Sequence, residues 1–149
     1  MNSHRFHVSH AIPGRIEGTF RIESENRALR LTVNRARTLH GGMVATLIDT
    51  GGSLAVASRG LFRTGVSTDI NATFVRSGGS AGDSVRVIGE VVNMGRSLAF
   101  TRVELRHPVS DAIIAYGNHT KYIRGCADDT SVEFNEQGNI VRGELPKDA

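Results

Sequence analysis

Asp49 is the residue of this 149-residue chain whose type and surroundings point most directly to chemistry. It is the only charged residue between His40 and Arg59. On a helical wheel it falls among small residues such as Ala45 and Gly52, where a second backbone can approach closely. A buried carboxylate costs free energy unless it is paired or hydrogen-bonded, and no basic residue lies one helical turn away. Asp49 is therefore predicted to be either a structural hydrogen-bonding group or a catalytic acid in a desolvated site.

The tripeptide His40-Gly41-Gly42 precedes Asp49 and offers a second set of reactive groups. Its glycines would leave backbone N–H groups without intrahelical partners at the positive end of a helix dipole. Such donors bind a phosphate, a carboxylate or the oxyanion that develops on a reacting carbonyl. The alternative is a tight turn that needs glycine for its backbone angles. Gly41 and Asp49 would lie about 12 Å apart along one helix, which is too far for one helix to form the site alone. They could meet in one site if a second protomer supplied one of them.

A single helix is predicted to carry these groups, from Gly42 to Ser58, ending near Gly60. Its large apolar residues fall within about 140° of arc at 100° per residue. The opposite side carries small residues instead of charges, which is typical of a helix buried on all sides. The apolar positions are Met43, Val44, Leu47, Ile48, Gly51, Leu54 and Ala55.

Alternating apolar and polar residues predict about six strands elsewhere in the chain. The turns between several of them are short and rich in Gly, Ser and Asn, which favours antiparallel pairing. We therefore expect an α+β fold in which one long helix is wrapped by an antiparallel sheet, with a partner protomer covering what the sheet leaves exposed. The alternation covers residues 16–22, 29–33, 70–74, 85–91, 99–105 and 113–122.

Composition excludes several classes of protein. With 39% hydrophobic and 22% charged residues, the chain is typical of one soluble globular domain. The most apolar stretch, residues 39–58, is too rich in Gly and Thr to be expected to span a membrane. The single cysteine, Cys126, rules out an intrachain disulfide and a cysteine-rich metal site. A net charge of +3, with 16 Arg and 2 Lys, is too small to indicate a nucleic-acid partner but suits a phosphate-bearing small ligand.

The charge also divides the chain. Residues 1–124 have a net charge of +7, and residues 125–149 have a net charge of −4. We expect a flexible N-terminus over residues 1–13, a folded domain over 14–124 and an acidic C-terminal extension over 125–149. A small hairpin is predicted in that extension, around Asn135–Gly138.

Four motifs occur in order between about residues 14 and 124: Asn34-x5-His40-Gly41-Gly42-x6-Asp49, Gly65–Asn71, Gly95–Thr101 and Ala115–Lys121. Together they resemble the hotdog-fold acyl-CoA thioesterases of the phenylacetyl-CoA and acyl-CoA thioesterase 13 type. The resemblance implies a hotdog fold, CoA thioesters as substrates and no metal or other cofactor, since a thiolate is a good leaving group. It also implies homodimers that often pair into tetramers, with active sites across the dimer interface. Cytoplasm is the default location, and mitochondria follow by analogy with some relatives.

The resemblance also implies roles for individual residues. Asp49 matches the catalytic acid, which acts as general base on water or as nucleophile. Gly41 matches the residue whose backbone N–H polarises the thioester carbonyl. His40 and Asn34 match residues that orient the thioester, contributed with Gly41 by the opposite protomer, and Ser67 matches the hydroxyl that helps to hold water.

The resemblance implies that the CoA moiety contacts the segment Phe74–Gly79, the turn Asn93–Leu98 and Tyr122. Arg76 and Arg96 are candidate partners for its phosphates. The loop from Val75 to Gly82 is richer in Gly than the Pro-containing turn common in the family, and one residue longer. His119 and Lys121 are expected to be structural or rim residues instead of catalytic ones. The CoA-contacting positions are Phe74, Val75, Arg76, Ser77, Gly78, Gly79, Asn93, Gly95, Arg96, Ser97, Leu98 and Tyr122.

Two alternatives remain open at this stage. The first is a hotdog module that binds acyl-CoA without hydrolysing it, although such a module has no need of an isolated buried acid. The second is a hotdog hydratase acting on enoyl thioesters. Hydratases pair an acid with a nearby histidine on the helix segment, whereas no histidine follows Asp49 before His107.

Overall fold

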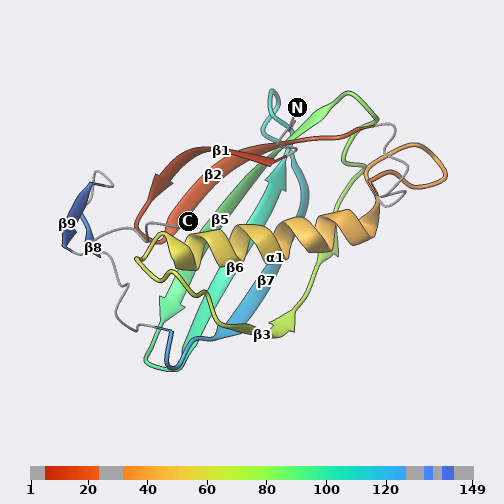
Figure 1. The fold of residues 1–149 in the computed structure, drawn as a ribbon. Coiled ribbons are helices and arrows are strands. Elements are labelled where there is room, and N and C mark those ends of the chain that lie inside the picture. The colour runs from red at the N-terminus through yellow and green to blue at the C-terminus, as the bar shows by residue number, and fades with distance from the viewer. Residues whose placement is uncertain (1–5, 24–31, 127–132, 136–138, 143–149) are drawn as a thin grey trace.

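One long helix crosses the concave side of an antiparallel sheet in the computed structural model, which describes residues 6–23, 32–126, 133–135 and 139–142 (Figure 1). The strand order in the sheet is β1-β2-β5-β6-β7-β3, and the short β4 pairs with β7. A separate hairpin, β8–β9, follows the sheet. The elements are β1 (Phe6–Ile12), β2 (Arg15–Arg21), α1 (Gly41–Ala57), β3 (Val66–Ile70), β4 (Thr73–Phe74), β5 (Ser84–Met94), β6 (Leu98–Arg106), β7 (Ile113–Tyr122), β8 (Glu133–Phe134) and β9 (Ile140–Arg142).

The predicted helix and the α+β architecture are confirmed, with each helix end shifted by one residue. Glycines allow α1 to lie directly on the sheet. A Cβ at Gly89 would stand 2.4 Å from the carbonyl oxygen of Gly51 in α1, and a Cβ at Gly51 would stand 3.0 Å from Val103. The middle of the helix therefore rests against β5 and β6 at a distance that larger side chains would prevent.

Two clusters of buried side chains fill the space between α1 and the sheet. The larger one lies under the N-terminal and middle turns of α1, and the smaller one lies under its C-terminal turn. Phe20 of β2 belongs to the first, and Phe6 of β1 packs against it. The larger cluster comprises Phe20, Ile22, Leu39, Val44, Leu47, Ile48, Val85, Val87, Val103, Leu105, Ile114 and Ala115; the smaller comprises Val56, Leu61, Ala99 and Ile123.

The prediction that α1 is buried on all sides is wrong for a single chain. Thr46 is exposed, while Ala45, Asp49 and Ser53 are half-buried. The sheet covers only one face of the helix. The residues that the structure describes leave the opposite face of the helix uncovered.

One part of the outer face of the sheet carries a balanced network of charges. Arg86 bridges Glu17 on β2 and Asp111 beyond β6, and Arg106 bridges Asp111 and Glu104. Burial would raise the pKa of Glu104, but its hydrogen bonds to Arg106 and Arg102 outweigh that effect and lower it. The network surrounds a shallow cavity of about 270 Å³. The charged side chains of this part of the outer face are therefore paired with one another, on the side of the sheet away from α1.

Three expectations about the strands need correction or qualification. The flexible N-terminus predicted over residues 1–13 is wrong for Phe6–Ile12, which pair with β2 as β1 because Phe6 packs on the core. The strand predicted over residues 70–74 begins at Val66 instead and is interrupted before β4. The strand predicted over 29–33 lies largely outside the described residues. The hairpin predicted in the acidic extension is confirmed as β8–β9.

Candidate active site

Side chains from α1, β3 and β7 meet at the middle of the helix. Asp49 Oδ1 lies 3.4 Å from His119 Nε2, and Ser67 Oγ lies 2.8 Å from the same nitrogen. The Asp49 side chain is 49% exposed, so the predicted burial of this carboxylate is wrong for a single chain. Asp49 and Ser67 thus flank one imidazole, and the carboxylate is open to solvent from the uncovered face of α1.

The imidazole of His119 is enclosed on its other side. Its side chain is 0% exposed, and its Nδ1 has no hydrogen-bond partner within the part of the chain that the structure describes. A Cβ on Gly52 would stand 2.9 Å from Nδ1 and 2.5 Å from Thr101 Oγ1, so the absence of a side chain there makes room for the ring. A buried N–H without an acceptor is costlier than a buried lone pair. We therefore assign the proton of neutral His119 to Nε2, which donates to Ser67 Oγ.

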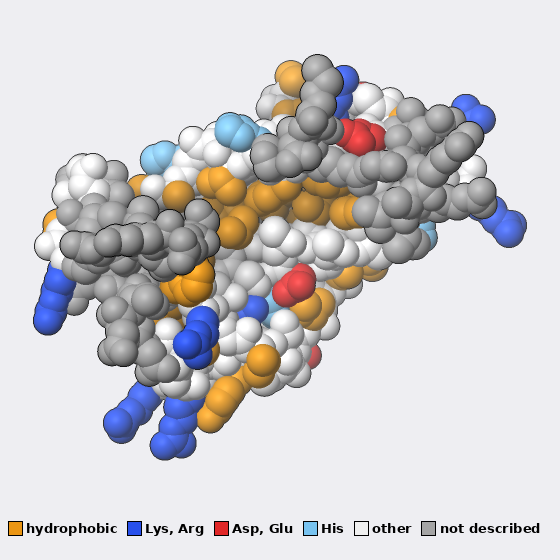
Figure 2. Space-filling model, in the orientation of Figure 1, with side chains coloured by type: hydrophobic (Ala, Val, Ile, Leu, Met, Phe, Trp, Pro, Cys, Tyr) orange, Lys and Arg blue, Asp and Glu red, His pale blue; other side chains and the backbone are white. Residues whose placement is uncertain are grey.

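Charge and burial act together on this histidine. Burial lowers the pKa of His119, and the nearby positive charge of Lys121 lowers it further, whereas the Asp49 carboxylate opposes both effects. Lys121 is itself 4% exposed and donates from Nζ to Ser53 Oγ at 2.8 Å. Burial lowers the pKa of Lys121, and Asp49 again opposes the shift. In Figure 2 an acidic and a basic side chain adjoin beside the helix on the face turned toward the viewer.

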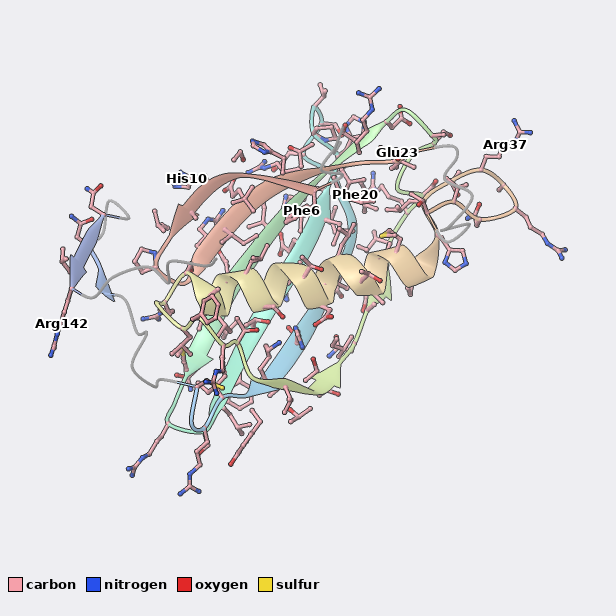
Figure 3. The ribbon with its side chains drawn as sticks, viewed as in Figure 1. Phe6, His10, Phe20, Glu23, Arg37 and Arg142 are labelled. Atoms are coloured by element: carbon pink, nitrogen blue, oxygen red, sulfur yellow. The ribbon has the colours of Figure 1, made fainter. Side chains whose placement is uncertain are left out.

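A second group of expected site residues lies at the N-terminus of α1. His40 is the N-cap residue, and its Nδ1 accepts the backbone N–H of Gly42 at 2.9 Å. The Asn34 amide is occupied within its own loop, donating to Thr38 Oγ1 at 2.8 Å. In Figure 3 the labelled Arg37 marks that loop beyond the helix N-terminus, away from the middle of α1. The Gly41 N–H makes no hydrogen bond within the described ranges, so it is a free backbone donor.

One protomer does not bring this group to Asp49. Gly41 is the first residue of the helix, and Asp49 lies eight residues later, which corresponds to about 12 Å. The segment from Phe74 to Gly79 lies at the Gly41 end: a Cβ on Gly41 would stand 3.4 Å from the Phe74 ring, and Gly79 accepts the Leu39 N–H at 3.0 Å.

The remaining expected CoA contacts lie toward the other end of the helix. Leu98 pairs with Tyr122 between β6 and β7, and Ser97 accepts the Ile123 N–H at 2.8 Å. Ile123 belongs to the small core cluster under the C-terminal turn of α1. The expected CoA residues thus form two groups at opposite ends of α1, with Asp49 between them.

Sequence reasoning missed the association of His119 and Lys121 with Asp49, because both were expected to be structural or rim residues. No histidine follows Asp49 on the helix segment, as the argument against hydration states, but a histidine contributed by β7 does lie beside Asp49. The available signal was the alternation of β7, in which His119 and Lys121 fall on the inward face. Which helix residue they meet depends on how β7 lies beneath α1.

Comparisons with known proteins agree with this architecture. Residues 36–111 match the family model described as the thioesterase superfamily. A Schizosaccharomyces pombe protein named as a candidate esterase is 41% identical over 119 residues, covering 80% of this chain and 70% of the relative. Human acyl-coenzyme A thioesterase 13 is 34% identical over 113 residues, covering 76% of each chain. The crystal structure of zebrafish thioesterase superfamily member 2 superposes with a TM-score of 0.71 at 33% identity, covering 79% of this chain and 80% of that one.

Proposed function

The chain belongs to the thioesterase superfamily and is a thioester hydrolase, and on this premise we propose that it hydrolyses acyl-CoA thioesters to a free acid and CoA. The name of its human relative, acyl-coenzyme A thioesterase 13, supports CoA thioesters as the substrate class. The observation that carries the proposal is the pair of oxygen groups around one imidazole: a half-exposed Asp49 carboxylate and the Ser67 hydroxyl.

In the proposed reaction, a water molecule binds between Asp49 and Ser67. His119 donates to Ser67 Oγ, so the Ser67 hydroxyl proton is free to point at the water and orient it. Asp49 accepts a water proton as the water oxygen attacks the thioester carbon. The tetrahedral intermediate then expels the CoA thiolate, which takes up the proton as thiol. Direct attack by the Asp49 carboxylate, followed by hydrolysis of an anhydride, is the other route that the same geometry allows.

The oxyanion donor in this proposal is the partner subunit's Gly41. Among the described residues, the Gly41 N–H has no acceptor. It lies at the positive end of the helix dipole, but it is too far along the helix to serve Asp49 of the same protomer. Two features support a homodimer built over α1 and β3: the helix face that the described residues leave uncovered, and apolar side chains exposed along the β3 edge. Val66 is 63% exposed and Ile70 is 39% exposed. Pairing of such dimers into a tetramer is part of the proposal by resemblance to the family.

We propose that the CoA moiety contacts two groups of residues, the Phe74–Gly79 group of one protomer and the Asn93–Leu98 and Tyr122 group of the other. Arg76 and Arg96 are both exposed, and their guanidinium groups suit bidentate binding of phosphate oxygens. The reaction requires no metal or other cofactor. In the described part of the chain, the helix is neither long nor apolar enough to cross a membrane. A cytoplasmic location is a separate proposal, with mitochondria as the alternative by analogy with some relatives.

The experiment is a thiol-release assay on the purified protein with acyl-CoA thioesters of graded chain length and with phenylacetyl-CoA. Wild-type protein is expected to release CoA, while Asp49→Asn is expected to lose turnover with its oligomeric state unchanged in size-exclusion chromatography. Asp111→Asn, on the opposite face of the sheet, is the matched control and is expected to retain activity. Full activity in Asp49→Asn would exclude the assigned role, and binding of acyl-CoA without thiol release would favour a binding module.

The contact between Asp49 and His119 raises hydration of enoyl thioesters as a second chemistry. His119 is fully buried and its Nε2 is engaged by Ser67, so its imidazole is not presented to a substrate. Hydrolysis therefore remains the better-supported function. Loss of the enoyl absorbance of crotonyl-CoA without release of thiol would instead indicate hydration.

A further inference from the structure

Lys121 is a buried cation beside the candidate active site, and the proposed hydrolysis gives it no role. Its side chain comes from the inward face of β7, where a lysine is unusual because its charge is normally solvated. Its Nζ lies 2.8 Å from Ser53 Oγ. Ser53 stands one helical turn after Asp49, a spacing that puts two Cβ atoms about 5–6 Å apart. The ammonium is therefore anchored one turn from the Asp49 carboxylate.

Every element around His119 contributes a polar group to this cluster. Two carboxylates act electrostatically on the His119 imidazole: Asp49 from α1 and Asp69 from β3. Thr101 of β6 donates to the His119 backbone oxygen at 2.8 Å and carries no charge. The groups facing His119 and Lys121 are Asp49 and Ser53 of α1, Ser67 and Asp69 of β3, Thr101 of β6, and Cys126 after β7.

In this arrangement the His119 imidazole and the Asp49 carboxylate compete for a proton. A carboxylate 3.4 Å from an imidazole nitrogen favours the imidazolium form. An imidazolium at this position would form an ion pair with Asp49 and reduce the ability of its carboxylate to accept a proton from water. Burial of His119 lowers its pKa, and the charge of Lys121 lowers it further, so both work against that ion pair.

We propose that Lys121 is a positioning residue of the thioesterase site: its ammonium, anchored on Ser53, keeps positive charge off His119, so that Asp49 faces an uncharged imidazole. The carboxylate then remains available to water, and His119 remains a neutral donor to Ser67. This inference rests on the proposed hydrolysis for its kinetic consequence. The effect of the Lys121 charge on the protonation of His119 is a property of the folded protein alone. It can be measured without turnover.

The kinetic test is the pH profile of kcat/KM for Lys121→Met, which keeps the length of the side chain and removes its charge. Without the neighbouring cation, His119 binds a proton at higher pH, so activity is lost earlier as the pH falls. The acidic limb of the profile is expected to move upward by about 1–2 pH units, with most of the kcat retained on the alkaline side. A purely structural lysine would lower activity at all pH values and leave the limb in place.

Arg102→Met is the matched control for removing a positive charge. Arg102 lies on β6, in register with Asn118 of β7, but on the outer face of the sheet over the Tyr116 ring. Its pH profile is expected to coincide with that of the wild type. An equal shift in Arg102→Met would attribute the effect to net charge and overturn the proposal.

The second measurement is an NMR titration of the His119 imidazole nitrogens in the wild type and in Lys121→Met, with no substrate present. His119 is expected to titrate at higher pH in the variant and to show the Nε2–H tautomer when neutral. An unchanged titration would overturn the role of Lys121 even if the enzyme hydrolyses acyl-CoA. Absence of turnover in the wild type would instead refute the proposed hydrolysis. The titration would then still decide whether Lys121 keeps His119 uncharged. Lys121→Gln serves as the second variant if Lys121→Met does not fold.

Discussion

Ser67 and His119 are 52 residues apart in the chain, yet the Ser67 hydroxyl oxygen lies 2.8 Å from His119 Nε2. The contact joins the edge strand β3 to β7, and the same nitrogen lies 3.4 Å from Asp49 on α1. Nδ1 of this imidazole is enclosed and has no partner among the described residues. We therefore assign the proton to Nε2, whose N–H donates a hydrogen bond to Ser67 Oγ. The Ser67 hydroxyl is thereby left to donate toward the open side of the cluster, where Asp49 is exposed.

This relationship predicts an order of activities among variants of His119 and Ser67. Ser67→Ala is expected to lower kcat by about 10- to 100-fold, because the water loses one orienting hydrogen bond. His119→Gln, whose amide nitrogen reaches the position of Nε2, is expected to retain more activity than His119→Asn, whose shorter amide does not reach it. Steady-state kinetics with one acyl-CoA substrate measures all three. Equal activity in the two His119 variants would contradict the Nε2–H assignment.

The proposed sharing of the site between protomers predicts complementation. Gly41→Pro removes the free backbone N–H at the first helical position, where proline is tolerated. Gly41→Pro and Asp49→Asn are each expected to be inactive alone. A co-refolded equal mixture is expected to recover about a quarter of wild-type turnover, because half of the dimers are mixed and each mixed dimer has one intact site.

Size-exclusion chromatography of the same samples provides the control for complementation. The single variants and the mixture are expected to elute at the same volume as the wild type. A mixture that stays inactive while forming normal oligomers would show that Gly41 and Asp49 do not act across an interface.

The buried histidine predicts a dependence of stability on pH. The pKa of His119 is lowered from its ordinary value of 6.5 in the folded chain, so the unfolded chain binds the proton more readily. Its contribution to the free energy of unfolding is therefore present above about pH 6.5 and is lost as the pH falls through the folded pKa. Urea unfolding is measured at pH 7.5 and at pH 5.5. The free energy of unfolding is expected to decrease more between these two pH values in the wild type than in His119→Gln. An equal decrease in both would contradict the assignment.

Gly52 is predicted to be intolerant of even one methyl group. A Cβ there would stand 2.5 Å from Thr101 Oγ1 and 2.9 Å from His119 Nδ1. Although alanine favours a helix, Gly52→Ala is expected to lower the free energy of unfolding by about 1–3 kcal/mol, because the overlap is buried. Gly95→Ala is the matched control, since the nearest atom to its Cβ would be 3.8 Å away. Thermal unfolding of the two variants compares them directly.

Local periodicity predicted most of the fold. The wide apolar arc between Met43 and Ala55 predicted the helix within one residue at each end, and two-residue alternation predicted the long strands β5, β6 and β7. Both patterns reflect which side of one element is kept from water, and this information is local. The terminal strand β1 was missed because its pairing depends on Phe6 reaching a core built by distant residues.

The sequence by itself also isolated Asp49, the only charge on a long apolar helix, and identified Ser67 through family resemblance. Tertiary structure alone decided that His119 and Lys121 adjoin Asp49, that Asp49 is half-exposed in one chain and that His40 caps the helix. Periodicity states which face of a strand turns inward, but not which residues of another element that face meets. That choice depends on strand register and on how closely α1 lies against the sheet, which Gly51, Gly52 and Gly89 set together.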